Sequence, residues 1–261
     1  RATTDEEVEQ TEINGTTEVK AVDPQPVAKT AAKQAIDEVL KAKSDEIDAR
    51  TDLTDEEKTA AKEEAKAKAD AAKEAIDKAT TNAEVGQAKT TGVTEVASVN
   101  PKALVKSAAK KAIDDKLAEQ LKVIANTPDA TDEEKKAAAD LAKQLAEIAK
   151  KAIDAARENV DVKKLKDNSK VGIEEAVPFV EDKPNARKAI DEEAKAKKAA
   201  IDTRTDISDK VKELLKAEVD GIATQAKKEI DAASSVDELN KIEEAKKSEI
   251  KAVEEVRVPA E

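Results

Sequence analysis

The chain has 261 residues, 41% of which are charged, and its net charge is −12 at neutral pH. Val, Ile, Leu and Phe together supply only 50 residues, a content at the border between folded and disordered chains. Cys, His, Met, Trp and Tyr are absent. Their absence excludes disulfides, thiol nucleophiles and the usual zinc and copper sites, and we expect no cofactor.

The 59 acidic residues outnumber the 47 basic ones. This balance disfavours nucleic acid as a partner, because phosphate binding needs a concentrated basic face and base stacking needs aromatic rings. No apolar run approaches the ~20 residues of a membrane span, so we expect no membrane insertion. No signal peptide or anchor sequence is recognisable. The chain begins and ends within its own pattern, and we interpret it as an excerpt of a longer protein.

A fixed spacing of 77 residues organises the sequence. It separates Ile-Asp dipeptides in two series, namely Ile36-Asp37, Ile113-Asp114 and Ile190-Asp191, and then Ile76-Asp77, Ile153-Asp154 and Ile230-Asp231. A long fixed period indicates tandem copies of one small domain. We predict the last helix of a truncated copy at 1–23 and full copies at 24–100, 101–177 and 178–261, the last with a short C-terminal remainder.

Each copy is predicted to hold three helices. The first helix starts at Asp23-Pro24 or Asn100-Pro101, which have the form of an N-cap followed by proline at the first helical position. In the third copy, we expect Pro184 to restart the helix after Pro178. Apolar residues then recur at spacings of three and four, which predicts one buried stripe per helix.

The second helix starts at a capping box, Thr54 with Glu57 and Thr131 with Glu134. The third copy keeps only the cap, Ser208, because Val211 stands where the glutamate would close the box. The third helix is predicted to start at Thr81 in the first copy, and its caps in the later copies are expected at Asn159 and Ser235. Gly15, Gly92 and Gly172 should weaken the third helix, since an interior glycine costs roughly 1 kcal/mol against alanine.

The connections between these helices are short and polar, which forces consecutive helices to run antiparallel. The fold class is therefore all-α, a tandem array of antiparallel three-helix bundles. Because the third helix of one copy ends where the next copy begins, we expect the copies to form an elongated monomeric rod. A helix of ~24 residues is ~36 Å long, so three copies in line would reach ~100 Å.

Several motifs admit a functional and a structural interpretation. The acidic triplets at 55–57 and 132–134 could bind a divalent cation, but capping already accounts for them. The Ile-Asp pairs could form a ligand site. We favour core isoleucines, each followed by an aspartate at the bundle edge near a lysine of the next helix. Lys110-Lys111 and Lys150-Lys151 could touch a polyanion, although acidic neighbours favour a solvated face.

Two further features remain open. Asn14-Gly15-Thr16 fits a glycosylation acceptor, a motif short enough to occur by chance. Phe179 is the only aromatic residue, and we expect it to cover the junction between two copies rather than to serve as an exposed binding anchor. No nucleophile and base pair, phosphate loop or cluster of acids points to catalysis, so we predict that the chain is not an enzyme.

A set of short motifs resembles a tandem repeat of Gram-positive cell-wall-anchored surface proteins, including giant matrix-binding adhesins. The motifs are found at Ala32–Asp37, Leu53–Lys58, Ala75–Val85, Gly92 and Val99–Pro101. The third copy departs from them at Asp206–Lys210 and lacks an Asn-Pro at its end. The resemblance implies a three-helix repeat that serves as stalk or spacer on the bacterial cell surface, and it transfers no catalytic residue.

Three functions are therefore weighed. The first is a structural stalk that holds a ligand-binding region away from the cell wall. The second is a helical binding module for a host extracellular-matrix or plasma protein. The third is a disordered desiccation protectant, which also has an Ala/Lys/Glu-rich composition. Caps and prolines that recur at 77 residues favour distinct folded helices over the protectant.

Overall fold

The computed structural model describes residues 4–12 and 25–253. In these ranges every regular element is helical, and a short helix covers residues 5–12. The longer helices of the described ranges are α2 (Gln25–Asp48), α3 (Asp55–Lys78), α4 (Asn82–Ala97), α5 (Leu104–Ala125), α6 (Asp132–Ala155), α7 (Asn159–Glu174), α8 (Asp182–Asp202), α9 (Asp209–Ala232) and α10 (Val236–Ala252). The prediction of an all-α protein with three helices in each copy is confirmed.

The chain divides into two compact units that do not coincide with the copies. Unit 1 contains residues up to 109 together with 153–163, and unit 2 contains residues 110–152 together with those from 164 onward. Unit 1 thus holds the first copy and the end of the second copy that adjoins it. Unit 2 holds the remainder of the second copy and the third copy.

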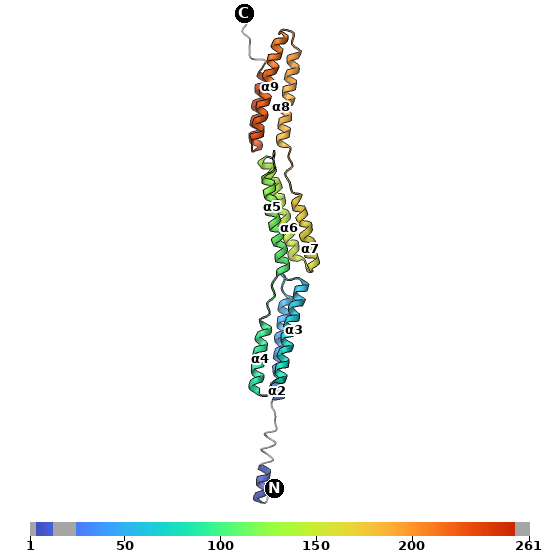
Figure 1. Ribbon diagram of the computed structural model, residues 1–261, viewed down its shortest axis with the longest axis vertical. Helices are drawn as coiled ribbons and strands as arrows, with labels where there is room; N and C mark the ends of the chain where they lie inside the picture. Colours follow the sequence, from blue (N-terminus) through green and yellow to red (C-terminus); the bar gives the residue numbers. More distant parts are fainter. Residues whose placement is uncertain (1–3, 13–24, 254–261) are drawn as a thin grey trace. The chain divides into compact units, whose positions relative to one another are not determined.

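In unit 1, α2, α3 and α4 lie side by side as one bundle (Figure 1). Ion pairs show that α2 and α3 are antiparallel, because Lys33 near the start of α2 pairs with Asp77 near the end of α3 at 2.5 Å. At the opposite end, Asp48 of α2 pairs with Lys62 of α3 at 2.8 Å. The bundle core contains many small side chains. It consists of Ala32, Ile36, Ile47, Leu53, Ala61, Ala65, Ala69, Ala72, Ile76, Ala79, Val85, Val96 and Val99.

Gly92 of α4 has a packing role that the sequence did not suggest. A Cβ atom added there would lie 2.4 Å from the Cβ of Ala72 and 2.8 Å from the Cδ1 of Ile36. The glycine therefore lets α4 approach α3 closely, instead of only weakening its helix. Gly172 has no such neighbour within 4 Å, and Gly15 lies outside the described residues.

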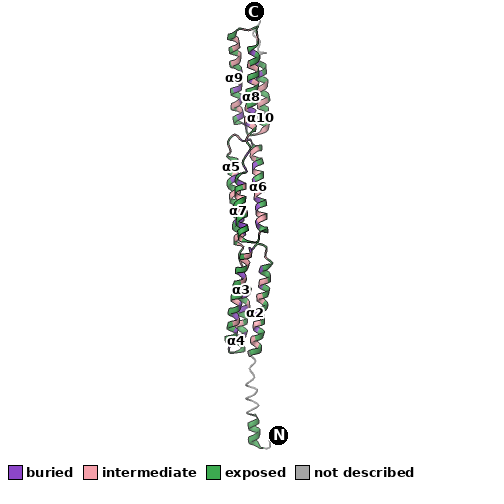
Figure 2. Cartoon of the chain, turned by 90° about the vertical axis from the view of Figure 1, so that its right-hand side faces the viewer, coloured by how far each residue is buried: buried purple, intermediate pink, exposed green. Residues whose placement is uncertain are grey.

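In unit 2, α8, α9 and α10 enclose a core with larger side chains. Its buried members are Ala186, Ile190, Ala194, Ile201, Val219, Ala223, Ala226, Ile230, Ala233, Leu239, Ile250 and Val253, with Leu215, Ile222 and Ile242 packed against them. The part of the second copy in this unit has a smaller cluster of Ile124, Ala138, Ala142 and Ala176. Figure 2 shows these buried positions interleaved with exposed ones along each helix.

Several predicted helix starts are wrong. Helix α5 begins at Leu104 instead of directly after Asn100, because its first amides are capped from another part of the chain, as described below. Helix α8 begins at Asp182, before Pro184, since proline is tolerated within the first turn of a helix. Asn159 is the first residue of α7, and its Oδ1 is buried without a hydrogen-bond partner, so it is not the cap. Asp23 and Pro24 lie outside the described residues.

Candidate functional site

The strongest constellation in the molecule lies where one copy meets the next. We define the distal pole of a copy as the end of its first helix and the start of its second. The proximal pole is the start of its first helix, the end of its second and the start of its third. In unit 1 the distal pole of the first copy contacts the proximal pole of the second. In unit 2 the distal pole of the second copy contacts the proximal pole of the third.

In unit 1, the distal pole is built on the cap of α3. Thr54 is fully buried, and its Oγ1 accepts a hydrogen bond from the backbone N–H of Glu57 at 3.3 Å. The Oε1 of Glu57 in turn accepts from the backbone N–H of Thr54 at 3.0 Å, which completes the capping box.

The second carboxylate oxygen of Glu57 caps a helix of the next copy. Glu57 Oε2 accepts hydrogen bonds from the backbone N–H groups of Leu104 at 3.0 Å and Val105 at 3.3 Å, at the start of α5. A helix N-terminus has unsatisfied N–H groups and a positive dipole end, so a carboxylate is a suitable partner. One side chain therefore satisfies two helix starts in two copies.

Two neighbouring residues extend this contact. Glu56 Oε2 accepts from the backbone N–H of Asn159 at 3.0 Å, at the start of α7. The backbone N–H of Asp55 donates to the carbonyl oxygen of Arg157 at 2.7 Å. The acidic triplet of the first copy is thus engaged by backbone groups of the second copy.

A buried lysine completes the junction from the other side. Lys106 is only 3% exposed, and its Nζ donates to the carbonyl oxygens of Asp154 at 2.6 Å and Thr51 at 2.9 Å. Asp154 lies in the last turn of α6, where a cation meets the negative end of the helix dipole. Lys106 therefore joins the distal pole of the first copy to the proximal pole of its own copy.

Unit 2 repeats these contacts 77 residues later. Glu134 Oε1 accepts from the N–H of Thr131 at 2.9 Å, and Oε2 accepts from the N–H groups of Glu181 at 2.6 Å and Asp182 at 3.1 Å. Glu133 Oε2 accepts from the N–H of Val236 at 3.0 Å.

The backbone and lysine contacts of the second junction follow the same order. The N–H of Asp132 donates to the carbonyl oxygen of Ser234 at 2.8 Å. The nearly buried Lys183 donates to the carbonyl oxygen of Asp231 at 2.9 Å. Since the glutamate contacts and the lysine contact with the end of the second helix recur at the same repeat positions, the junction is a property of the repeat rather than of one place in the chain.

Arginines are used differently at the two junctions. In unit 1, Arg50 donates to the carbonyl oxygen of Pro101 at 2.6 Å. In unit 2, Arg187 binds both carboxylate oxygens of Asp129, and its Nη1 also contacts Asp231 at 2.8 Å. The guanidinium of Arg187 holds the pKa of Asp129 below its usual range, because the hydrogen bonds and the positive charge favour the carboxylate.

The pKa of Glu134 is also lowered. Burial raises it, but hydrogen bonds from the backbone N–H groups of Glu181, Thr131 and Asp182 outweigh the burial. Glu134 is therefore an ionised acceptor at neutral pH. This arrangement neutralises helix ends and holds backbone groups. It lacks a paired nucleophile and base.

The Ile-Asp residues are placed at the core and the bundle edge of every copy. All six isoleucines of the two series are fully buried. The aspartates of the first series pair with a lysine of the second helix, in Asp37–Lys73, Asp114–Lys150 at 3.0 Å and Asp191–Lys227 at 2.5 Å. Exposed pairs of this kind contribute ~0–1 kcal/mol each, so they fix the register of two helices more than they stabilise them.

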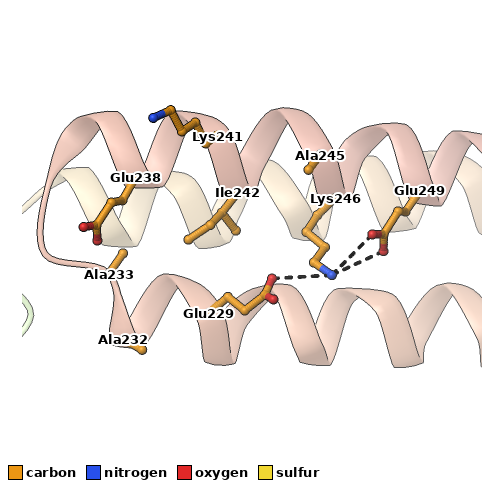
Figure 3. A pocket seen from close by; sticks show the side chains of 9 residues that line it. All are labelled: Glu229, Ala232, Ala233, Glu238, Lys241, Ile242, Ala245, Lys246 and Glu249. Carbon is orange, nitrogen blue, oxygen red and sulfur yellow. Dashed lines mark hydrogen bonds and ion pairs between the residues drawn. The ribbon is translucent and has the colours of Figure 1, made fainter.

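An open groove lies between α9 and α10, with a volume of about 600 Å³ (Figure 3). Ala232, Ala233, Ile242 and Ala245 line its apolar part. Lys246 reaches across it to Glu229 at 3.4 Å and also pairs with Glu249 at 3.3 Å. The groove offers a shallow apolar surface with a charged rim, which suits contact with another molecule better than chemistry.

Phe179 does not cover a junction, so that prediction is wrong. Its side chain is 76% exposed, because the junction is made of carboxylates and backbone amides and leaves no apolar pocket for a ring. Within residues 4–12 and 25–253, no cluster of three acidic, His or Cys residues is arranged to hold a metal ion. No helix in the described part of the chain combines the length and apolarity that a membrane span requires. Asn14-Gly15-Thr16 lies outside the described residues.

Sequence reasoning identified the caps but missed what they hold. Ser208 caps α9 by accepting from the N–H of Val211 at 3.3 Å, and it is exposed. Sequence reasoning also attributed Glu56 and Glu133 to capping of their own helices, whereas they bind the next copy, and it missed Lys106 and Lys183. A signal was available for the lysines, because Lys29, Lys106 and Lys183 recur at the 77-residue step.

The chain is similar to extracellular matrix-binding proteins of Staphylococcus aureus. Extracellular matrix-binding protein EbhA of Staphylococcus aureus strain Mu3 is 27% identical over 259 residues, which is 98% of this chain and 4% of that protein. The EbhA protein of strain Newman is also 27% identical, with 98% of this chain and 7% of that protein covered. The chain therefore spans only a small part of the length of these relatives. No solved structure matches it.

The family described as Domain of Unknown Function (DUF1542) matches residues 28–104, 105–181 and 182–258. These three matches follow one another at the 77-residue step and together cover most of the sequence. The chain therefore belongs to the DUF1542 family and carries three tandem copies of its repeat.

Proposed function

We propose that the chain is a structural spacer in the stalk of a bacterial cell-surface adhesin, where it projects a ligand-binding region away from the cell wall. The observation that carries the proposal is the junction, since glutamates at the same repeat positions join consecutive copies in both units. In this contact a glutamate of one copy caps the start of a helix in the next copy. Such a contact suits an array that functions through its length. The repeat boundaries at 24, 101 and 178, and the truncated copy at 1–23, belong to the same proposal.

The relatives support an extracellular location and a role without catalysis, because they are named as extracellular matrix-binding proteins. We infer that the full-length protein is anchored to the cell wall and that this part of it is a monomeric rod. Small-angle X-ray scattering of the chain tests the shape. A maximum dimension of ~100 Å or more supports the rod, while that of a compact globule of 261 residues would contradict it.

Force spectroscopy tests the mechanical role. A 77-residue copy that unfolds under tension should add about 23 nm of contour length, which is its extended length less the ~36 Å length of the folded bundle. Repeated steps of this size support a stalk that lengthens by one copy at a time. A trace without a repeating step, or with one all-or-none event, would contradict it.

A second candidate is a binding module for a host extracellular-matrix or plasma protein. The names of the relatives favour it, together with the groove between α9 and α10 and the exposed Phe179. Surface plasmon resonance with fibronectin, fibrinogen and albumin tests this candidate. Micromolar binding that Ile242→Asp abolishes would place this function first, whereas the absence of binding leaves the spacer role alone.

A further inference from the structure

The third copy caps its second helix but lacks the residues that hold a neighbouring copy. The 77-residue step places Lys210 where Glu56 and Glu133 stand, and Val211 where Glu57 and Glu134 stand. Neither side chain can accept a hydrogen bond, because an ammonium group only donates and an isopropyl group does neither. The distal pole of the third copy is therefore without both acceptors that serve the first two junctions.

The sequence after the third copy differs at the matching donor positions as well. The backbone N–H groups of Val105 and Asp182 donate to the glutamates, whereas Pro259 stands at the next step and has no N–H. Ala260 stands where Lys106 and Lys183 stand in the earlier copies. Pro259 and Ala260 lie outside the described residues, so this comparison concerns their identity alone.

The proximal pole of the first copy, by contrast, keeps the donor set. Lys29 donates to the carbonyl oxygen of Asp77 at 2.9 Å, the same contact that Lys183 makes with Asp231 at 2.9 Å. Val27, at the position of Leu104, lies in the first turn of α2, where backbone N–H groups have no intrahelical acceptor.

From these differences we propose that the two glutamates after the cap, with the helix amides that donate to them, form a docking surface that selects another copy of this repeat. The proximal pole of the first copy accepts a preceding copy that carries both glutamates. The distal pole of the third copy, with Lys210 and Val211, does not dock a following copy in this way. Junctions in such an array are then of two kinds, docked and merely tethered.

The acceptor and donor changes support each other because they lie on opposite sides of one contact. A carboxylate acceptor makes a stronger hydrogen bond than a neutral one, so its loss weakens docking most. Once the glutamates are absent, loss of the lysine or of one amide would weaken docking little further. This agrees with the absence of the lysine and of one N–H at the matching positions after the third copy.

The test gives the second copy, within the full chain, the two residues that stand after the cap in the third copy. The double variant Glu133→Lys, Glu134→Val gives the second copy the distal pole of the third. Helix α6 should still form, since α9 forms with a hydroxyl cap and Val211 at the same place. Glu63→Lys, Glu64→Val is the matched control, because these residues are exposed in the body of α3 and the charge change is identical.

Amide hydrogen exchange reports docking directly. In the double variant, exchange at Asp182 and Val236 should accelerate at least about tenfold, because their amides lose charged acceptors. The control should leave both rates unchanged. Equal protection of these amides in the double variant and the wild type would overturn the proposal.

Distance measurement gives a second readout that does not depend on amide exchange. The chain contains no cysteine, so Gln144→Cys and Ala217→Cys on exposed faces of α6 and α9 allow spin labelling. The distance distribution should be narrow in the wild type and control and broad in the double variant, with unchanged helix content by circular dichroism. If helix content falls, Glu133→Ala alone removes the acceptor of the Val236 N–H and leaves the contacts between Thr131 and Glu134 in place. An unaltered narrow distribution in that variant would also count against docking.

The inference extends the proposed spacer by assigning its stiff and loose junctions. Its test measures docking within the isolated chain, whereas scattering and force spectroscopy test the spacer. Either can therefore fail while the other stands.

Discussion

The first and third copies pack their third helix against the second in different ways. In the first copy, alanines of α3 face Gly92, and the two helices approach until no Cβ atom would fit. In the third copy, Lys246 stands at the position of Gly92 and reaches across an open groove to Glu229. Larger side chains, such as Leu215 and Ile222, supply the burial that close approach supplies in the first copy.

The difference shows that the repeat does not depend on one core composition. Burial of apolar area stabilises by ~25 cal/mol per Å², so an alanine core needs close approach and tolerates little expansion. A core with isoleucine and leucine tolerates a spaced third helix. The glutamates of the distal poles, by contrast, make the same contacts in the first two copies, because a junction has to match the next copy.

The largest effect should come from truncating the central isoleucine. Ile36→Ala and Ile190→Ala remove the same fully buried side chain from the first and third copies. Each should cost about 2–5 kcal/mol through lost burial and a cavity. The first copy should unfold at the lower denaturant concentration, because four of the five buried residues of α3 are alanines, against two of the four of α9. Copy-resolved hydrogen exchange in denaturant measures this, and a first copy that survives longer than the third would break the comparison.

A smaller effect should follow from adding one methyl group to α4. Gly92→Ala gains ~1 kcal/mol of helix propensity but should lose about 1–3 kcal/mol by overpacking against Ala72, so the net change is destabilising. Gly86→Ala in the same helix meets nothing within 4 Å and should stabilise by up to ~1 kcal/mol. Chemical denaturation of both variants measures the sign. Stabilisation by both would show that α3 and α4 are not in close contact.

Removing a cap should have a cost that differs between copies. Thr54→Val leaves the N–H of Glu57 without its acceptor beneath a docked copy, at a cost of about 1–3 kcal/mol. Ser208→Ala removes an exposed cap and should cost about 0.5–1 kcal/mol. Thermal denaturation followed by circular dichroism measures both. Equal losses would mean that docking adds nothing to the buried cap.

Acidification should give the smallest effect, and Glu134 at the second junction should contribute to it. The folded pKa of Glu134 lies below its unfolded value of about 4.3. Ionised Glu134 therefore contributes stability above that pH, and this contribution is lost as the pH falls through the folded pKa. Exchange at Asp182 should accelerate over this range, and Glu134→Gln should abolish the titration. A carboxyl titration midpoint at or above about 4.3 in carbon NMR would contradict the assignment.

Much of the bundle could be predicted because its signals are local. Ile36, Ile113 and Ile190 follow from apolar spacing, and all are buried. Thr54 and Ser208 could be predicted as caps because each accepts a hydrogen bond from an N–H only three residues along the chain. The failures concern partners distant in sequence. Asn159 is of a residue type that often caps helices, yet its backbone N–H donates to Glu56, 103 residues away.

The sequence by itself determined the repeat length, the number of helices in a copy, the isoleucines of the core and the caps of the second helices. These depend on spacings within a few helical turns, which a residue pattern records directly. Only the tertiary structure decided that Glu57 and Glu134 cap a helix of the next copy, that Lys106 and Lys183 are buried, and that Gly92 admits a neighbouring helix. These features depend on which helix ends meet in space. The partners at those ends are backbone amides and carbonyls, which every residue type has, so the sequence does not identify them.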